Sequence, residues 1–167
     1  MRQSAVFVAF AAAAALSACA SKPPVADNTP PPAPTQPETP RGPVPGSVED
    51  FRVSVGDRVF FGLDRADLTA EARQVLERQA AWLQRYPNVQ VLIAGNCDER
   101  GTREYNLALG ARRAAAARDY LASLGVATAR MQTVSYGKER PIDPRSNEEG
   151  WSINRNAQTQ IVSGAVS

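Results

Sequence analysis

The sequence predicts an α+β domain in which two helices pack on one side of a mixed β-sheet, with elements in the order β-α-β-α-β-β. One basis for this prediction is that segments of strand composition alternate with segments whose apolar residues recur every three or four positions. Another is a change of composition, because ten of the thirteen prolines lie between Pro23 and Pro45. The 167 residues therefore divide into a signal peptide of residues 1–18, a tether of residues 19–47 and a folded domain of residues 48–167.

Four strands are expected in the folded domain. Val53–Phe61 contains β-branched and aromatic residues and is followed by Gly62, a pattern typical of a strand. The other three strands are expected at Val89–Ala94, Met131–Tyr136 and Arg155–Val162. The polar segment around Pro141 and Pro144 is expected to be a loop.

Two helices are expected between these strands. The first begins after Thr69, a favourable N-cap, and continues to about Tyr86, since Pro87 cannot extend it. Its buried face is expected to comprise Ala72, Val75, Leu76, Ala80 and Leu83. The second covers Glu104–Leu124, and Gly125 supplies a C-terminal cap. Its buried stripe is expected to comprise Leu107, Ala111, Ala114, Leu121 and Leu124.

The N-terminal segment has the features of a bacterial export signal. Arg2 precedes Ala5–Leu16, a run of twelve uncharged residues that would measure about 18 Å as a helix. A bilayer core is about 30 Å thick, so this run is too short to span it. Leu16-Ser17-Ala18-Cys19 resembles the lipoprotein processing box, which implies that Cys19 becomes an acylated N-terminus. Ala20 after the cysteine resembles outer-membrane lipoproteins; the alternative is ordinary signal peptidase cleavage, which would release a soluble protein.

The tether lacks the apolar periodicity that a buried core requires. Ala20–Ser47 contains 28 residues, is rich in proline and is expected to be disordered with polyproline II character. At about 3.1 Å per residue it would extend at most about 90 Å. We therefore expect it to hold the folded domain away from a membrane.

Composition excludes several classes of function. Without histidine, the chain cannot form a Ser-His-Asp or Cys-His triad or a histidine-ligated zinc site. Two cysteines cannot form a four-thiolate metal site, and a net charge of +2 is too small to indicate nucleic-acid binding. We expect no metal, no cofactor and no nucleic-acid partner.

One segment brings complementary charges together. Asp98 lies where the second expected strand leads into the second helix, while Leu109 and Arg113 lie four residues apart on one face of that helix. Such a set could clamp a zwitterion, with Asp98 accepting from an ammonium and Arg113 donating to a carboxylate. Alternatively, Asp98 pairs with Arg113 or with Arg100, and the charge pattern alone leaves both possibilities open.

A resemblance adds to this interpretation. The segment resembles the signature of OmpA-like peptidoglycan-binding domains, and the similarity covers Val55–Val162 in the right order. Further matching segments are Val59–Asp64, Ser135–Pro141 and Asn154–Arg155. The resemblance implies a site for the diaminopimelate-containing stem peptide of peptidoglycan. Its main contacts would be Asp98 and Arg113, and its flanking contacts would be Asp64, Arg100 and Leu109.

Three residues near this segment raise further questions. Asn96 stands where the family commonly has histidine, and Asn156 stands where the motif usually has a second arginine. Asn96 still offers a donor and an acceptor, so we expect the loop geometry to survive. Cys97 has no obvious partner and is interpreted either as a small buried residue or as a redox-active thiol.

The resemblance, the processing box and the tether together imply a non-enzymatic lipoprotein. It would be anchored in the outer membrane, bind peptidoglycan non-covalently, engage the β-propeller protein TolB and other Tol-system proteins, and support envelope integrity and division. One alternative is a cell-wall hydrolase that uses Asp98 and Glu99, although adjacent carboxylates rarely lie on opposite sides of a glycosidic bond. Another is an OmpA-like lipoprotein outside the Tol system.

Overall fold

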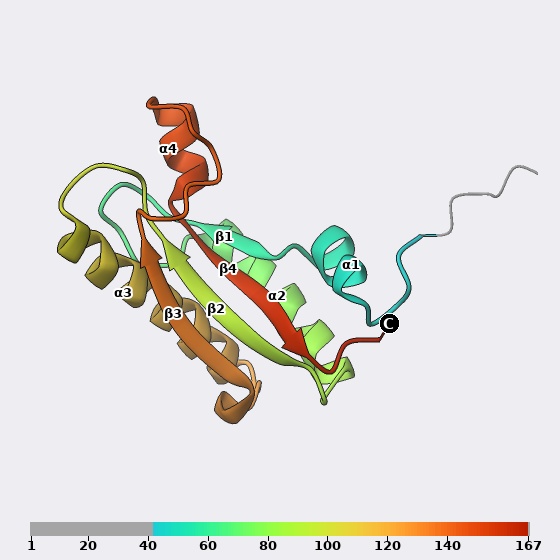
Figure 1. Cartoon of the computed structure of the whole chain (residues 1–167). Helices are drawn as coiled ribbons and strands as arrows, with labels where there is room; N and C mark the ends of the chain where they lie inside the picture. The colour runs from blue at the N-terminus through green and yellow to red at the C-terminus, as the bar shows by residue number, and fades with distance from the viewer. Residues whose placement is uncertain (1–41, 167) are drawn as a thin grey trace, which may run out of the picture. The chain divides into compact units, whose positions relative to one another are not determined.

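The computed structural model describes residues 42–166, in which four strands form one mixed sheet (Figure 1). The strands are β1 (Arg58–Phe60), β2 (Gln90–Asn96), β3 (Met131–Gly137) and β4 (Asn156–Ser163), in the spatial order β1-β4-β2-β3. β2 and β3 are parallel, whereas β4 is antiparallel to both β1 and β2. The signal peptide, Cys19 and the tether up to residue 41 lie outside the described residues.

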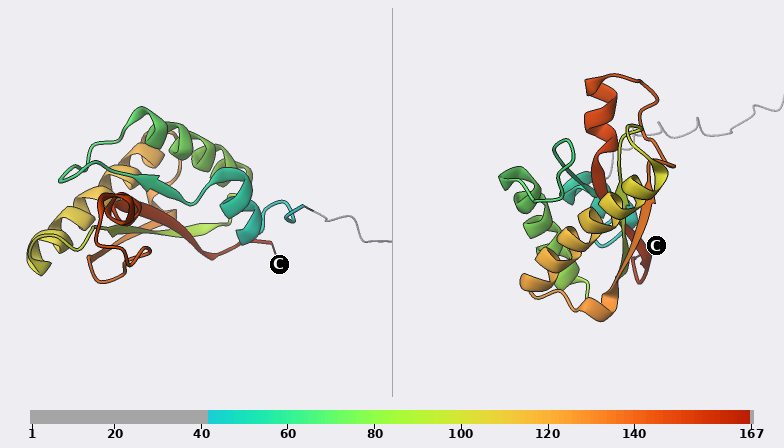
Figure 2. Two further views of the ribbon diagram at one scale, coloured as in Figure 1. Left: turned by 90° about the horizontal axis from the view of Figure 1, so that it is seen from above. Right: turned by 90° about the vertical axis from the view of Figure 1, so that its left-hand side faces the viewer.

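Two long helices, α2 (Ala70–Arg85) and α3 (Arg103–Ser123), cover one face of this sheet (Figure 2). α3 connects β2 to β3, as parallel neighbours require a crossover. The remaining helical segments are α1 (Val48–Asp50), the π-helix η1 (Phe51–Val55), the 3₁₀-helix η2 (Thr128–Arg130) and α4 (Glu148–Asn154). The α+β class with helices on one side of a mixed sheet is therefore confirmed. None of the helices between residues 42 and 166 is both long and apolar enough to cross a bilayer.

Local signals placed the ends of both long helices to within one residue. The Thr69 side chain accepts a hydrogen bond from the backbone N–H of Ala72 at the start of α2, and Thr102 accepts from Tyr105 at the start of α3. Gly125 follows α3 with a φ of 95°, the left-handed conformation of a helix C-terminal cap. All residues expected on the buried face of α2 are buried, except the half-buried Val75.

The strand expected at Val53–Phe61 was wrong over most of its length. Residues 48–55 are helical, and only Arg58–Phe60 pair with β4. Ser47 caps α1, and Phe51 and Val55, four residues apart, both reach the core. The Phe51 ring packs edge-on against Trp82 of α2, with 4.9 Å between the ring centroids. Packing on α2 therefore favours a helical turn where residue composition had indicated a strand.

Two further expectations need correction. The polar segment after Pro144 contains α4, which is capped by the Asn147 side chain through the backbone N–H of Gly150. On α3, Ala111 is exposed, and the buried residues are Asn106, Leu109, Gly110, Arg113, Ala114, Ala117 and Leu121. Of the expected stripe, Ala114 and Leu121 are buried, Leu107 and Leu124 are half-buried, and only Ala111 was wrong. The apolar pattern missed Asn106 and Arg113, because it places polar residues outside.

The hydrophobic core lies between the sheet and the two long helices. Its most buried members include Phe51, Leu76, Leu83, Val91, Ile93, Ala114, Ala117 and Leu121. The end of the expected tether also contacts this domain, because Ser47 forms a bridge with Val166 and the Val166 N–H donates to the Gly46 carbonyl over 3.0 Å. The N- and C-terminal ends of the described chain therefore lie side by side.

Gly95 of β2 and Gly110 of α3 mark the closest approach of helix and sheet. A Cβ atom added at Gly95 would lie 1.8 Å from the carbonyl oxygen of Gly110, so only glycine fits without moving α3. This contact lies next to the end of β2 and therefore sets the distance between the loop that follows β2 and helix α3.

We expect Gly95→Ala to lower the free energy of unfolding by about 3 kcal/mol, because the added methyl group forces α3 away from β2. Urea denaturation followed by circular dichroism measures this loss. Gly42→Ala is the control, since no heavy atom lies within 4 Å of its added Cβ. An unchanged urea midpoint for Gly95→Ala would contradict the close packing described here.

Candidate binding site

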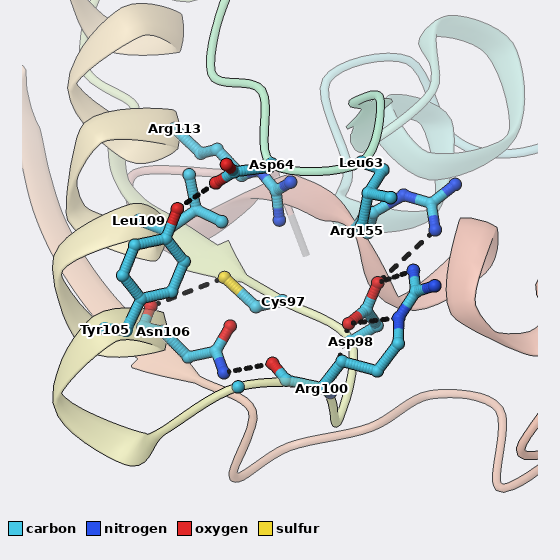
Figure 3. Close-up of a pocket in the computed structure, with 11 residues that line it drawn as sticks. Leu63, Asp64, Cys97, Asp98, Arg100, Tyr105, Asn106, Leu109, Arg113 and Arg155 are labelled. Atoms are coloured by element: carbon cyan, nitrogen blue, oxygen red, sulfur yellow. Dashed lines mark hydrogen bonds and ion pairs between the residues drawn. The ribbon is translucent and has the colours of Figure 1, made fainter.

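A cavity of about 250 Å³ lies at the carboxyl end of β2 (Figure 3). The topology brings four chain segments to this edge: the ends of β1, β2 and β3, and the start of the antiparallel strand β4. All five residues expected from the sequence line it, namely Asp64, Asp98, Arg100, Leu109 and Arg113. The other lining residues are Leu63, Cys97, Gly101, Tyr105, Asn106 and Arg155.

The loop between β2 and α3 forms one wall and is held by backbone contacts. The Cys97 N–H donates to the carbonyl of Gly137 over 2.8 Å, which is the last contact before the chain leaves the sheet. The Asn106 side chain donates to the carbonyls of Arg100 and Thr102 over 2.7 and 3.0 Å. Gly101 takes a φ of 87°, a conformation that favours glycine. This bonding fixes the loop in one shape.

The carboxylate of Asp98 is buried and fully hydrogen-bonded. Oδ1 accepts from the backbone N–H and the Nε of Arg100, each over 3.2 Å. Oδ2 accepts from Arg100 Nη2 over 2.6 Å and from Arg155 Nη1 over 3.3 Å. Burial raises the pKa of Asp98, but the hydrogen bonds from Arg100 and Arg155 outweigh it and hold the pKa below its ordinary value. The pairing of Asp98 with Arg100, one of the two alternatives left open by the sequence, is present.

Arg113 is completely buried on α3 and bonds to backbone rather than to Asp98. Its three guanidinium nitrogens donate to the carbonyls of Arg65, Asn96 and Gly62 over 2.8, 2.8 and 3.1 Å. Burial lowers the pKa of Arg113. These bonds use three of the five N–H groups of the guanidinium, and Arg113 is among the residues that line the cavity.

The opposite wall combines an acid with apolar side chains. The Tyr105 hydroxyl donates to Asp64, a hydrogen bond that raises the pKa of Tyr105. Asp64 has a φ of 55°, which lies in the left-handed region. Among non-glycine residues, aspartate and asparagine tolerate this region best. Leu63 and Leu109 supply apolar surface beside it.

Arg155 is the charged lining residue that sequence reasoning did not assign to the site. It is buried, and it donates to the carbonyl of Phe61, to Asp98 and to Glu148 over 3.1, 3.3 and 2.7 Å. The segment Asn154–Arg155, which matches the family pattern, could have indicated Arg155. However, nothing in the neighbouring sequence indicated that its side chain would contact Asp98, 57 residues earlier in the chain. With Arg155 included, three guanidinium groups and two carboxylates line the cavity.

The two departures from the family pattern contact each other. Asn96 Nδ2 donates to Asn156 Oδ1 over 3.0 Å, and Asn156 Nδ2 donates to the carbonyl of Ile153 over 2.8 Å. Both side chains are buried, so this bond satisfies polar groups that would otherwise be costly to bury. The loop geometry is held here by a pair of amides.

Cys97 and Glu99 are not arranged for catalysis. Burial raises the pKa of the Cys97 thiol, which donates to the carbonyl of Asn106 over 3.4 Å, as expected for a small buried residue. Glu99 does not line the cavity, and its carboxylate accepts from the indole N–H of Trp151 over 3.0 Å. Asp98 and Glu99 therefore do not face each other across the cavity as a glycosidase pair would.

Known proteins resemble this chain in sequence and in fold. The sequence pattern of the OmpA family matches residues 60–155. A protein named peptidoglycan-associated lipoprotein from Agrobacterium fabrum is 58% identical to this chain over 121 residues, which cover 72% of this chain and 68% of that protein. The protein of the same name from Brucella melitensis is 59% identical over 121 residues, which cover 72% of this chain and 71% of that protein. The crystal structure of the peptidoglycan-associated lipoprotein from Burkholderia pseudomallei is 42% identical, with a TM-score of 0.61 over 63% of this chain and 89% of that one. The C-terminal domain of Helicobacter pylori MotB shares the fold, with a TM-score of 0.60 and 23% sequence identity. The match covers 64% of this chain and 84% of the MotB chain.

The low pKa of Asp98 makes stability depend on pH. The folded state favours the ionised form of Asp98, so ionised Asp98 stabilises the fold fully at pH values above its ordinary pKa of 3.8. This stabilisation is lost as the pH falls through the lower pKa that Asp98 has in the folded state. Asp98→Asn should therefore lower the free energy of unfolding by about 3 kcal/mol at pH 7, and by much less at acid pH.

Urea denaturation at pH 7 and at acid pH measures this difference. Asp119→Asn, at an exposed ion pair with Arg118, is the control and should change stability little at either pH. A loss for Asp98→Asn that is equal at both pH values would contradict the ionic role of Asp98.

Proposed function

Since the chain belongs to the OmpA family, we propose that it binds the stem peptide of peptidoglycan non-covalently, at a diaminopimelate residue. The observation that carries this proposal is the meeting of Asp64, Asp98, Arg100, Leu109 and Arg113 around one cavity. The names of the relatives from Agrobacterium and Brucella, which include the words peptidoglycan-associated, support the same ligand. The protein is in this proposal a binding protein and not an enzyme.

The charges of the cavity suit an amino-acid centre with both an ammonium and a carboxylate. Arg113 offers two N–H groups to a carboxylate, and the buried guanidinium makes such a bond strong because it is poorly hydrated. Asp64 and Asp98 attract the ammonium, and Leu109 packs against the aliphatic chain that joins the two charged centres of diaminopimelate. The excess of one positive charge favours a ligand with a free carboxylate over its amidated form.

The ammonium is expected to approach Asp64 first. Asp98 already accepts four hydrogen bonds, so its carboxylate attracts the ammonium mainly through its charge. Asp64 accepts from Tyr105, and among the described residues its second oxygen has no side-chain donor. We therefore assign the direct ammonium contact to Asp64 and a supporting electrostatic role to Asp98.

The anchor is proposed from the sequence, because residues 1–41 lie outside the described structure. The box ending at Cys19 and the word lipoprotein in the names of the relatives support an acylated Cys19. Several acyl chains give stable attachment where one gives only marginal binding. The chain would then link the outer membrane to the cell wall through its tether, with TolB and other members of the Tol–Pal system as partners.

Asp64→Asn should weaken binding of a diaminopimelate-containing stem peptide by about tenfold, or about 1.4 kcal/mol, because it removes the charge that faces the ammonium. Asparagine tolerates the positive φ of this position, so folding should be preserved. Arg113→Lys should weaken binding at least as much, because an ammonium cannot replace a guanidinium that bonds to three carbonyls and to a ligand. Calorimetric titration measures both effects.

Matched controls lie beside each position. Asp67→Asn is on the same loop as Asp64 but is exposed and paired with Arg65, and Arg112→Ala is the exposed neighbour of Arg113. Both should bind like the parent protein. The site assignment is wrong if the control variants lose binding while Asp64→Asn and Arg113→Lys, shown to be folded by circular dichroism, keep it.

For the anchor, we expect the mature chain to begin at Cys19 with a mass that exceeds the polypeptide by its acyl groups. Cys19→Ala should move the protein from the membrane fraction to the soluble fraction and leave the unfolding temperature of the domain unchanged. Mass spectrometry and membrane fractionation test this. A soluble mature chain that begins at Ser21 would indicate ordinary secretion instead.

A further inference from the structure

α4 stands at the end of the sheet that carries the cavity, directly before β4 (Figure 1). Its residue Trp151 is half-buried and does not line the cavity. The indole nevertheless contacts two consecutive residues of the loop that forms the cavity wall. Its ring lies against the Arg100 guanidinium, with 4.0 Å from the guanidinium carbon to the ring centroid, and its N–H donates to Glu99 over 3.0 Å.

Arg100 is held between this ring and the cavity. On one side its guanidinium forms a two-point bond with Asp98, through Nε over 3.2 Å and Nη2 over 2.6 Å. Its Nη1 lies 3.8 Å from Glu148, the first residue of α4. The side chain is 34% exposed, so without the ring one face of the guanidinium would turn to water. A long arginine side chain held only by its edge can exchange among rotamers, whereas an aromatic ring fixes the guanidinium plane.

The same indole keeps Glu99 out of the cavity. The Glu99 carboxylate is bound to the indole N–H, and this bond lowers the pKa of Glu99. The wall of the cavity therefore presents Asp98 and Arg100 but not the negative charge between them. One neutral side chain thus contacts two neighbouring charged residues of this loop, Arg100 through its ring and Glu99 through its N–H.

We propose that Trp151 is a positioning residue of the binding site: it holds the Arg100 guanidinium in the orientation from which Arg100 binds Asp98, without touching the ligand. Its effect on affinity rests on the proposed function, but its effect on Arg100 does not. The two can therefore be measured separately.

The first experiment needs no ligand. In nuclear magnetic resonance spectra of the folded chain, the side-chain protons of Arg100 should be shifted upfield by the ring current of the indole. Trp151→Leu should return these signals to the region of the other arginines, while Trp151→Phe, which keeps a ring face, should retain part of the shift. Arg100→Lys identifies the signals. Loss of the ring removes this shift in any case, so the deciding measurement is the relaxation order parameter of the Arg100 Nε–H, which should fall in Trp151→Leu; an unchanged order parameter would overturn the proposal.

The second experiment measures affinity for a diaminopimelate-containing stem peptide by calorimetry. Trp151→Leu should weaken binding about fivefold, which corresponds to about 1 kcal/mol, and Trp151→Phe should weaken it less. Ser152→Ala is the control, since this neighbouring hydroxyl donates only to the Glu149 carbonyl within α4. Circular dichroism establishes folding, and Trp151→Phe carries the test if Trp151→Leu does not fold.

A double-mutant cycle separates positioning from general stability. In a background that lacks both charged groups bound by the indole, Arg100→Ala with Glu99→Ala, Trp151→Leu should have no further effect on affinity, because the groups through which it acts are absent. An equal loss in both backgrounds would show that Trp151 acts by another route and would overturn the proposal. If the parent protein does not bind the stem peptide at all, the proposed function fails, while the Arg100 spectra still decide whether Trp151 positions that side chain.

Discussion

The buried guanidinium of Arg113 is the interaction on which the site depends. It joins three carbonyls, two in the loop after β1 and one at the end of β2, to a single residue of α3. Burying a cation is costly unless its N–H groups are bonded, so these three carbonyls are what allow the charge to remain in the interior. Because they are neutral acceptors, the charge stays available to an anionic group in the cavity. The residue that joins these segments of the fold is thus also the one that we propose as the carboxylate-binding residue of the site.

The remaining charges form a network around that cation. Arg155 at the start of β4 and Arg100 in the loop after β2 both bind Asp98, so the carboxylate is supported from two elements. α4 completes the network through Glu148, which contacts Arg155 and Arg100. Such bonding fixes side chains before a ligand arrives, which reduces the entropy that binding must remove. The departures Asn96 and Asn156 preserve this arrangement by bonding to each other.

Sequence reasoning found five of the cavity residues because the resemblance placed them, and charge pattern alone left their pairing open. The structure shows that Asp98 pairs with Arg100, while Arg113 bonds to carbonyls that carry no sequence signal. Arg155 and Tyr105 complete the cavity from other parts of the chain. Main-chain acceptors and partners tens of residues away cannot be inferred from spacing, because any residue provides a carbonyl.

The sequence by itself determined the features that depend on a few neighbouring residues. The caps at Thr69 and Gly125 and the end of α2 before Pro87 follow from local backbone and side-chain chemistry. Tertiary structure decided the rest. Helix rather than strand at residues 53–55 depends on the packing of Phe51 against Trp82. Burial of Arg113 rather than Ala111 depends on carbonyls as far away in the sequence as that of Gly62. The physical reason is that the free energy of burying a side chain depends on the groups it contacts in the folded chain, and these groups lie far from it in the sequence.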